Sequence, residues 1–292
     1  MTTHNEEAAF PLIVAPGELE GQVALVTGGG RGIGRATAQA LAAAGATVVI
    51  TSRSQEELDQ TLGLLEQAGG KGLAVVADVT QQDSIERVVQ LAEKQVGPID
   101  LLVNNAGSAG GFGKIAEVDP ALWWRDLEIN VYGTFLVTHA VLPAMLARRR
   151  GRIINVASYL GTVPFPYGSA YSVSKTALIR FTETLALEAR EQGISTFAIH
   201  PGTVLTQLTP QKDPDGSAKL LPDQFVESFR ARSIDPPELG ANLIVFLATG
   251  KADVLSGRYI SAHDDLLAMI QRGEEIQHQN FYTLRLSVGQ KG

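Results

Sequence analysis

The chain has 292 residues, and 45% of them are hydrophobic, which is enough to bury a large core. It contains no cysteine, so disulfide bonds, thiolate catalysis and cysteine-ligated zinc are excluded. The net charge of −7 argues against broad nucleic-acid binding. Because the sequence shows no apolar run of about 18 residues, no basic N-terminal signal and no metal-ligand spacing, we expect a soluble cytoplasmic protein.

The first predicted element follows an irregular N-terminal extension, residues 1–20. An apolar run at residues 23–27 predicts a buried strand, and an alanine-rich helix is predicted over residues 35–44. The turn between them would let the backbone approach a pyrophosphate at the positive end of the helix. An ordinary glycine-rich turn is the alternative, but the flanking strand and helix favour a nucleotide site. The predicted contacts are Gly28, Arg31, Gly32, Ile33 and Gly34.

A second strand is predicted at residues 47–51, and the residues after it bear on the choice of cofactor. About twenty residues beyond the glycine turn, a dinucleotide fold places the group that contacts the adenosine ribose. Ser52 and Arg53 occupy this place, and no carboxylate occurs before Glu56. Arg53, together with Arg31, could bind a 2′-phosphate, which predicts NADP(H) over NAD(H). Two solvated surface arginines are the alternative.

Strands and helices alternate through the rest of the chain. Further strands are predicted at residues 73–77, 99–103, 153–157, 194–199 and 255–260, with helices between them over 55–67, 84–96, 123–147, 171–191 and 236–249. This alternation predicts a single α/β domain over residues 21–262. Its fold would be a Rossmann-type, doubly wound parallel sheet of about seven strands in three α/β/α layers, with right-handed crossovers. Ligands of such sheets bind beyond the carboxyl ends of the strands.

Tyr171 and Lys175 are four residues apart on a predicted helix, so they share one face. A nearby ammonium would lower the pKa of the phenol, and Ser158 at the end of a strand could add a hydroxyl to the same site. This predicts a proton-transfer site; an exposed Tyr/Lys pair on an amphipathic helix is the alternative. A structural role is expected for His200.

Three other segments have less specific signals. The loop at residues 159–170 predicts either a rigid connector or an apolar substrate pocket formed by Tyr159, Phe165 and Tyr167. The basic residues 148–150 are expected to oppose the negative end of a helix, with docking of an acidic carrier as the alternative. Residues 207–235 predict a lid or a mobile loop. In the C-terminal extension, residues 263–292, a helix over 264–272 and a short strand near 284–288 are expected.

Taken together, these motifs resemble the short-chain dehydrogenase/reductase family in its single-domain form, over about residues 20–260. The matching positions are Thr27, Gly28, Gly32, Gly34, Asp78, Val79, Asn104–Gly107, Asn130, Ser158, Tyr171, Lys175, Pro201, Gly202 and Thr206. The resemblance weakens at Ser261–Asp265, where many relatives have a glycine-containing turn.

The resemblance implies specific roles for these residues. Tyr171 would be the general acid/base, Ser158 would orient the substrate oxygen, Lys175 would bind the nicotinamide ribose and lower the pKa of Tyr171, and Asn130 would hold a water that relays protons. Asp78 and Val79 would contact adenine, and Val204 and Thr206 the carboxamide. The cofactor site would also include Asn105, Ala106, Gly107 and Pro201.

The expected function is therefore an NADP(H)-dependent oxidoreductase that interconverts a ketone and a secondary alcohol. A redox-silent, NADP-binding regulatory protein on the same fold is the alternative, although the complete set of site residues argues against it. The expected partner is a small carbonyl or alcohol substrate, with neither nucleic acid nor membrane. Relatives also pair through helices that correspond to residues 121–147 and 171–191, so a homodimer or homotetramer is expected.

Overall fold

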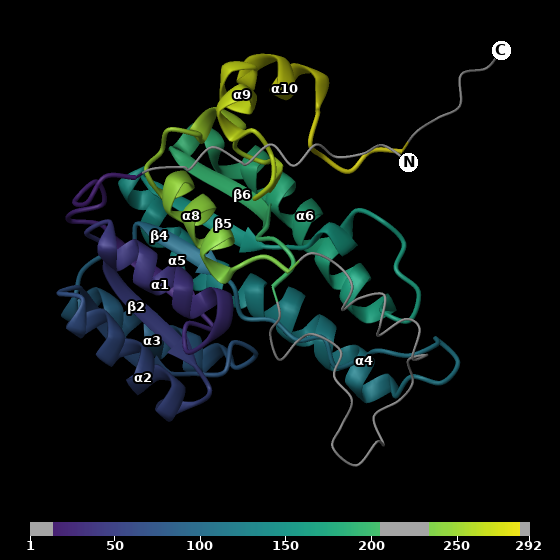
Figure 1. The fold of residues 1–292 in the computed structure, drawn as a ribbon, viewed down its shortest axis with the longest axis horizontal. Helices are drawn as coiled ribbons and strands as arrows, with labels where there is room; N and C mark the ends of the chain where they lie inside the picture. Colours follow the sequence, from purple (N-terminus) through teal and green to yellow (C-terminus); the bar gives the residue numbers. More distant parts are fainter. Residues whose placement is uncertain (1–13, 205–233, 287–292) are drawn as a thin grey trace.

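The fold is built on one parallel sheet (Figure 1). The structure is a computed structural model, and it describes residues 14–204 and 234–286. The strand order is β3-β2-β1-β4-β5-β6-β7, and all neighbouring strands run parallel. The strands are β1 (Val23–Thr27), β2 (Thr47–Ser52), β3 (Lys71–Val76), β4 (Leu101–Asn104), β5 (Gly151–Val156), β6 (Ile194–His200) and β7 (Tyr259–Ser261). This confirms the predicted Rossmann-type α/β fold.

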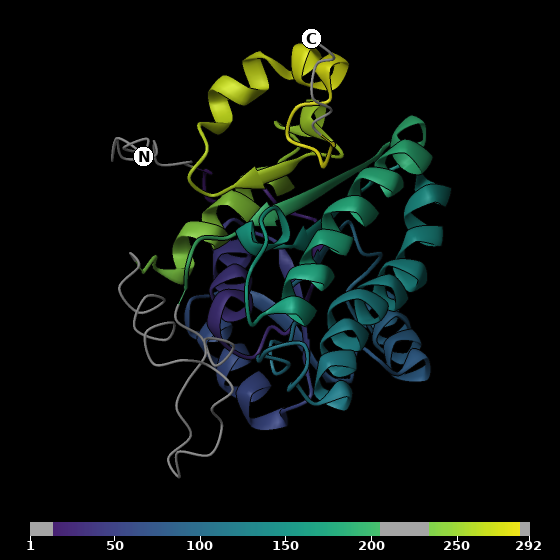
Figure 2. The same ribbon diagram turned by 90° about the vertical axis from the view of Figure 1, so that its right-hand side faces the viewer.

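Helices cover both faces of the sheet, as the two perpendicular views show (Figures 1 and 2). One face carries α1 (Gly32–Ala43), α2 (Gln55–Gln67) and α8 (Pro237–Ala248); the other carries α3 (Gln82–Gln95), α5 (Thr134–Arg148) and α6 (Ser169–Ala189). The central strands are buried on both faces, which explains their continuous apolar runs. The three layers predicted from the sequence are therefore present.

The connection from β6 to β7 differs from the prediction of right-handed crossovers throughout. The step from β5 to β6 and the step from β6 to β7 move in the same direction across the sheet. However, α6 covers one face and α8 covers the other, where it packs against α1. The last crossover therefore has the opposite hand to the others, which is a rare topology.

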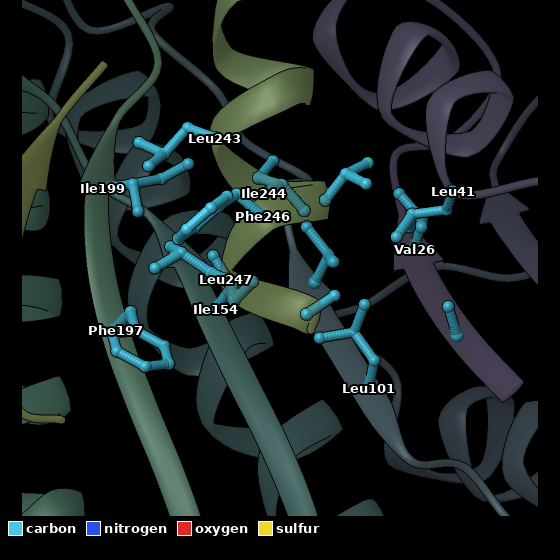
Figure 3. Packing of buried hydrophobic residues seen from close by; sticks show 14 of the residues in the cluster. Val26, Leu41, Leu101, Ile154, Phe197, Ile199, Leu243, Ile244, Phe246 and Leu247 are labelled. Atoms are coloured by element: carbon cyan, nitrogen blue, oxygen red, sulfur yellow. The ribbon is translucent and has the colours of Figure 1, made fainter. Parts of the chain in front are cut away.

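The largest hydrophobic cluster lies between the sheet and the layer of α1 and α8 (Figure 3). In Figure 3, Ile154, Phe197 and Ile199 from β5 and β6 face Leu243 and Leu247 of α8. All five side chains are essentially excluded from solvent. Because burying such a side chain contributes about 1.5–3 kcal/mol, this layer rigidly fixes the strand ends that bear the polar residues.

The long helix predicted over residues 123–147 is interrupted. The structure has α4 (Pro120–Leu127), a π-helical segment η1 (Glu128–Gly133) and then α5. A π segment inside a helix is uncommon and is often found at functional sites, and this one contains Asn130. The stretch Pro120–Arg148 is long and apolar enough to cross a membrane by length and composition, but in this fold α5 packs on α3 and on the sheet.

Parts of both terminal extensions pack on the domain. Leu19 is 1% exposed and belongs to the main hydrophobic cluster. The C-terminal extension forms α9 (Leu266–Gln271) and α10 (Gly273–Gln279), and the second helix was not predicted. Residues 284–286 of the predicted short strand form no strand, and residues 287–288 lie outside the described residues; the Leu284 carbonyl instead accepts a hydrogen bond from Arg180.

The arginines at the end of α5, residues 148–150, make contacts within the chain. Arg148 donates to the carbonyl oxygen of Ile99 (2.7 Å), Arg149 donates to that of Glu191 (2.6 Å), and Arg150 lies 3.6 Å from the Asp100 carboxylate. These contacts support the structural role of this basic cluster over the docking of an acidic carrier.

Candidate active site

A cleft of about 1450 Å³ lies along the carboxyl ends of the strands. Most of the residues predicted for the cofactor line it: Gly28, Arg31, Gly32, Ile33, Gly34, Ser52, Arg53, Asp78, Val79, Asn105, Ala106, Gly107, Tyr171, Lys175, Pro201 and Val204. Thr206 lies outside the described residues. The fold thus brings together, in one cleft, polar groups that are up to 176 positions apart in the printed sequence, from Gly28 to Val204.

At one end of the cleft, the glycine turn approaches the neighbouring backbone very closely. A Cβ atom on Gly34 would lie 2.1 Å from the carbonyl oxygen of Gly28, which leaves no room for a side chain. Gly28 has a φ of +64°, a conformation that favours glycine. Asn105 connects this turn to β4, because its Nδ2 donates to the carbonyl oxygens of Thr27 (2.9 Å) and Gly28 (3.2 Å). The turn is therefore held open toward the cleft with the start of α1 beside it.

One of the two arginines expected to contact the adenosine half of the cofactor already has a partner within the chain. Arg31 forms an ion pair with Glu57 (3.5 Å), and both side chains are partly exposed. Glu57 lines the cleft, and the sequence analysis did not identify it. A Cβ atom on Gly30 would lie 2.8 Å from the Glu57 Cβ and 3.1 Å from Ser52 Oγ, so these groups are close together. A partly exposed carboxylate next to the predicted phosphate site weakens the positive field there.

Asp78 lies at the end of β3 and has two kinds of partner. Its carboxylate accepts hydrogen bonds from the backbone N–H (2.9 Å) and the hydroxyl (2.8 Å) of Thr80, and it lies 3.4 Å from Arg125 of α4. Burial would raise the pKa of Asp78, but these hydrogen bonds and the charges of Arg125 and Arg53 hold the pKa below its ordinary value. The adenine end of the cleft therefore includes an ionised carboxylate.

The proposed acid and its two partners meet in the middle of the cleft. Tyr171 and Lys175 lie one turn apart on α6, and Lys175 Nζ is 5.5 Å from the centre of the Tyr171 ring. Ser158 follows β5, is 7% exposed and forms a hydrogen bond with Tyr171. Lys175 Nζ donates to the carbonyl oxygen of Val156 (2.7 Å). The three predicted side chains therefore converge, as the sequence pattern indicated.

The pKa values of this pair differ from the sequence-based expectation. Burial raises the pKa of Tyr171; a hydrogen bond with Ser158 opposes this, and the negative charge of Asp126 adds to it. Burial also lowers the pKa of Lys175 from its ordinary value to about 8, against a smaller raising effect of Asp126. Burial is the largest influence on the phenol, so the Tyr171 pKa lies above its ordinary value, opposite to the lowering that the sequence analysis expected.

Asn130 lies beside this group but does not line the cleft. Its Oδ1 accepts from the Ser108 backbone N–H (2.7 Å), and its Nδ2 donates to the Ser108 carbonyl oxygen (2.9 Å) and to Ser174 Oγ (2.9 Å). It is 0% exposed. Its side chain thus joins the glycine loop after β4 to α6, and the water relay implied by the resemblance remains a prediction.

The far end of the cleft is more apolar, and the predicted pocket is only partly correct. Tyr159 lines the cleft, but Phe165 and Tyr167 are absent from its lining. Phe165 instead packs edge-on against Phe112, with the ring centres 6.4 Å apart, and Phe112 lines the cleft. Sequence reasoning missed Phe112 because the bend that brings residue 112 over the site depends on contacts with α4.

His200 also forms part of the cleft wall, at the end of β6. Burial lowers its pKa to about 4, so the imidazole is neutral at physiological pH. Its ring centre lies 6.4 Å from that of Tyr159, and its Nδ1 is buried with no hydrogen-bond partner in the described part of the chain. The structural role that the sequence analysis expected for His200 stays a prediction.

These residues fit a nicotinamide dinucleotide. The closely packed turn at Gly28 and Gly34 would hold the pyrophosphate, and the residues at the ends of β2 and β3 would hold the adenosine half. Tyr171 and Lys175 line the same cleft and would contact the nicotinamide ribose. Two observations support this fit: there is no space for a Cβ atom on Gly34, and the residues that follow β1, β2, β3 and β5 all line one cleft.

Comparison with known proteins agrees with this reading. The family model described as short chain dehydrogenase matches residues 22–216. The chain is 35% identical to a short chain dehydrogenase of Pseudocercospora fijiensis over 89% of this chain and 85% of the relative. It is 36% identical to human dehydrogenase/reductase SDR family member 4 over 83% of this chain and 86% of the relative. A crystal structure of NAD⁺-bound xylitol dehydrogenase superposes with a TM-score of 0.73 at 30% identity, covering 83% of this chain and 98% of that one.

Proposed function

The chain belongs to the short chain dehydrogenase family and is an NAD(P)-dependent oxidoreductase, and from this we propose that it interconverts a ketone and a secondary alcohol with NADP(H). The observation that carries the proposal is the meeting of Ser158, Tyr171 and Lys175 in the middle of the dinucleotide cleft. The cofactor, when bound, supplies or accepts the hydride. The side chains of this protein bind the substrate oxygen and move its proton.

In the direction of reduction, Ser158 and Tyr171 hold the substrate oxygen where negative charge develops. Tyr171 then gives its phenolic proton to that oxygen. A protonated Lys175 stabilises the phenolate that forms, since its Nζ lies within 5.5 Å of the ring centre. Its lowered pKa, about 8, also leaves it able to exchange a proton near physiological pH. In the direction of oxidation the same groups act in reverse.

The preference for NADP(H) is the finer part of the proposal. Arg53 and Arg31 supply positive charge at the adenosine end, and Ser52 stands where a carboxylate would favour NAD. Glu57 acts against this preference by pairing with Arg31, and NAD⁺ is the cofactor in the xylitol dehydrogenase structure. We therefore infer a moderate preference for NADP(H), with Arg53 as the stronger determinant because no ion pair of Arg53 is present among the described residues.

The substrate is proposed to be a small carbonyl compound or alcohol with an apolar portion. Phe112, Tyr159 and Leu160 line the cleft near Tyr171, and Ile234 lies at its rim. These side chains suit an apolar group attached to the reacting carbon. We propose a protein of the cytoplasm with neither membrane nor nucleic-acid partner, in agreement with its acidic charge and absence of cysteine.

A homodimer or homotetramer is proposed from the apolar side chains left exposed on two helical segments. Tyr132 and Phe135 are 47% and 45% exposed, and their rings stack with centres 6.4 Å apart. On α6, Val173 and Leu187 are 49% and 76% exposed. Exposed apolar groups on neighbouring long helices favour burial against a second copy of the chain.

The most direct test is a panel of ketones and secondary alcohols, with turnover followed at the nicotinamide absorbance. We expect turnover of apolar members in the wild type and none in Tyr171→Phe. Binding of NADPH without turnover of any member, in either direction, would instead support the alternative of a redox-silent binding protein.

A further inference from the structure

Asp126 of α4 is a buried carboxylate that the mechanism above does not use. It is 1% exposed. Its Oδ1 accepts hydrogen bonds from Ser108 Oγ (2.6 Å) and the Gly110 N–H (2.9 Å), and its Oδ2 accepts one from the Gly111 N–H (2.9 Å). All three donors belong to the loop after β4. A carboxylate at such depth is stable only when it is well hydrogen-bonded, so these contacts strongly constrain the loop.

This loop forms one wall of the cleft. Ser108 and Gly110 line the cleft. The loop continues to Gly111, which lies between α4 and α6. A Cβ atom on Gly111 would lie 3.0 Å from the Trp123 Cα in α4 and 3.2 Å from the Ala170 Cβ, directly before Tyr171. Asp126 therefore fixes the wall that faces the start of the catalytic helix.

The charge of Asp126 also acts on the reacting pair. Its negative charge acts to raise the pKa of both Tyr171 and Lys175, and among the described residues no other carboxylate acts on either group in this way. The other titratable side chains around Tyr171 are tyrosines and a histidine: Tyr159 after β5, His200 at the end of β6 and Tyr259 on β7. Burial lowers the pKa of His200 to about 4 and raises that of Tyr259, so both are neutral near physiological pH.

We propose that Asp126 is a positioning residue of the site: it holds the Ser108–Gly111 wall against the start of α6 and places one negative charge beside Tyr171 and Lys175. The inference rests on the proposed oxidoreductase function. It assigns to Asp126 two separable effects, one geometric and one electrostatic, and each has its own measurement.

The test compares Asp126→Asn with two other variants of the full chain. In Asp126→Asn we expect the KM of a carbonyl substrate to rise about ten-fold, because at least one loop hydrogen bond to a charged acceptor is lost. We also expect the high-pH limb of kcat in reduction to move to lower pH, because the groups that must be protonated lose a neighbouring negative charge. Asp126→Glu retains the charge, so it should raise KM and leave the position of that limb unchanged.

Asp119→Ala is the matched control. Asp119 is exposed and caps the same helix by accepting from the Ala121 N–H (2.8 Å), so its loss destabilises α4 without touching the loop. We expect a lower Tm with KM and the pH profile unchanged. If the wild type turns over substrate and Asp126→Asn behaves like Asp119→Ala, the Asp126 inference is wrong while the proposed function stands.

A second measurement is independent of turnover. Amide hydrogen exchange over residues 107–113 should become faster in Asp126→Asn than in the wild type, since the Gly110 and Gly111 amides lose a charged acceptor. Unchanged exchange would overturn the positioning role. If the wild type turned over no substrate, the proposed function would fail, and this exchange experiment would still decide the geometric effect of Asp126.

Discussion

Lys175 Nζ lies 5.5 Å from the centre of the Tyr171 ring and donates its hydrogen bond to the carbonyl oxygen of Val156. The lysine therefore influences the phenol through its charge across the ring face, while Ser158 makes the direct hydrogen bond to Tyr171. This division supports the proposed roles, in which Tyr171 would donate the proton, Ser158 would orient the substrate oxygen, and Lys175 would give electrostatic support.

Replacing Tyr171 by phenylalanine should abolish turnover, because no other described group in the cleft combines a transferable proton with a hydrogen bond to Ser158. NADPH affinity, measured by the fluorescence of the bound nicotinamide, should change less than about five-fold, since one neutral hydrogen bond contributes about 1 kcal/mol. Turnover close to that of the wild type would remove Tyr171 from the mechanism.

Replacing Lys175 by methionine should increase the stability of the fold while abolishing turnover. Burial lowers the pKa of Lys175 from its ordinary value to about 8, so the unfolded chain binds this proton more tightly than the folded chain. The charged lysine therefore destabilises the fold at pH 7, and this penalty disappears as pH rises through about 8 toward the ordinary lysine range. We expect Lys175→Met to increase the free energy of unfolding by about 1–3 kcal/mol.

The same variant should lose turnover and bind NADPH more weakly, because Lys175 is proposed to contact the ribose. Urea unfolding at pH 7 gives the stability, and NADPH titration gives the affinity. A variant that is less stable than the wild type would show that the Val156 hydrogen bond outweighs the cost of burying the charge. Unchanged affinity would remove the ribose role.

Replacing Glu57 by glutamine should strengthen the preference for NADP(H). The Glu57 carboxylate pairs with Arg31 at 3.5 Å, and both groups are partly exposed. Releasing Arg31 for a 2′-phosphate is therefore worth about 0.2–1 kcal/mol, a change of up to about five-fold in the ratio of Kd values for NADP and NAD. Isothermal titration with both cofactors measures this ratio, and NAD affinity serves as the internal control.

The opposite change is expected for the pair Arg53→Ala and Ser52→Asp. It removes a phosphate contact and introduces a carboxylate for the 2′-hydroxyl, so the double variant should prefer NAD. Equal affinities of the wild type for the two cofactors would contradict the NADP(H) proposal. The loss expected for Arg53 alone is about 1.5–3 kcal/mol of NADP binding, as for other charge-assisted contacts to phosphate.

Glu183 joins α6 to the C-terminal extension. Its carboxylate is 7% exposed and pairs with Arg180 of α6 and with Arg285, whose Nη1 is 3.1 Å from Glu183 Oε2. Burial would raise its pKa, but the hydrogen bond and charges of the arginines hold the pKa below its ordinary value. A lowered carboxyl pKa stabilises the fold above the unfolded pKa, and this stability is lost as pH falls through the folded pKa.

We expect Glu183→Gln to lower stability by about 1–3 kcal/mol at pH 7 and to remove part of the loss of stability toward acid pH. Deletion of residues 281–292 should produce a similar but smaller effect while keeping α10, whose Ile276 is 0% exposed in the main hydrophobic cluster. Thermal unfolding at pH 7 and pH 4 compares the variants. Stability equal to the wild type in both would show that the segment after α10 contributes nothing to the fold.

The assembly proposal predicts at least a dimer in light scattering at micromolar concentration. Phe135→Glu places a charge on the exposed aromatic pair and should shift the protein toward the monomer without changing its circular dichroism. Leu122→Glu, on the neighbouring helix α4 and 48% exposed, shows whether the apolar contact extends along this surface. A wild-type monomer would contradict the proposal directly.

The fold class, and the gathering of most candidate site residues in one cleft, could be predicted from the sequence. Apolar runs set the strands, and since the carboxyl ends of parallel strands meet at one edge, the polar residues after them had to share one cleft. The spacing of Tyr171 and Lys175 on a helix fixed their common face, and the spacing of the glycines fixed the tight turn. These are local rules, and they hold whatever surrounds the elements.

Properties that depend on neighbours distant in the sequence could not be predicted from local patterns. Burial, which no local pattern reports, set the pKa of Lys175 at about 8 and raised that of Tyr171. Phe112 lines the cleft, whereas the sequence predicted Phe165 there. The path of the loop that carries Phe112 depends on the hydrogen bonds that Asp126 accepts from the Gly110 and Gly111 amides. The opposite hand of the last crossover likewise follows from the packing of α8 on α1. Each of these outcomes depends on contacts between segments whose relative placement becomes defined only when the chain folds.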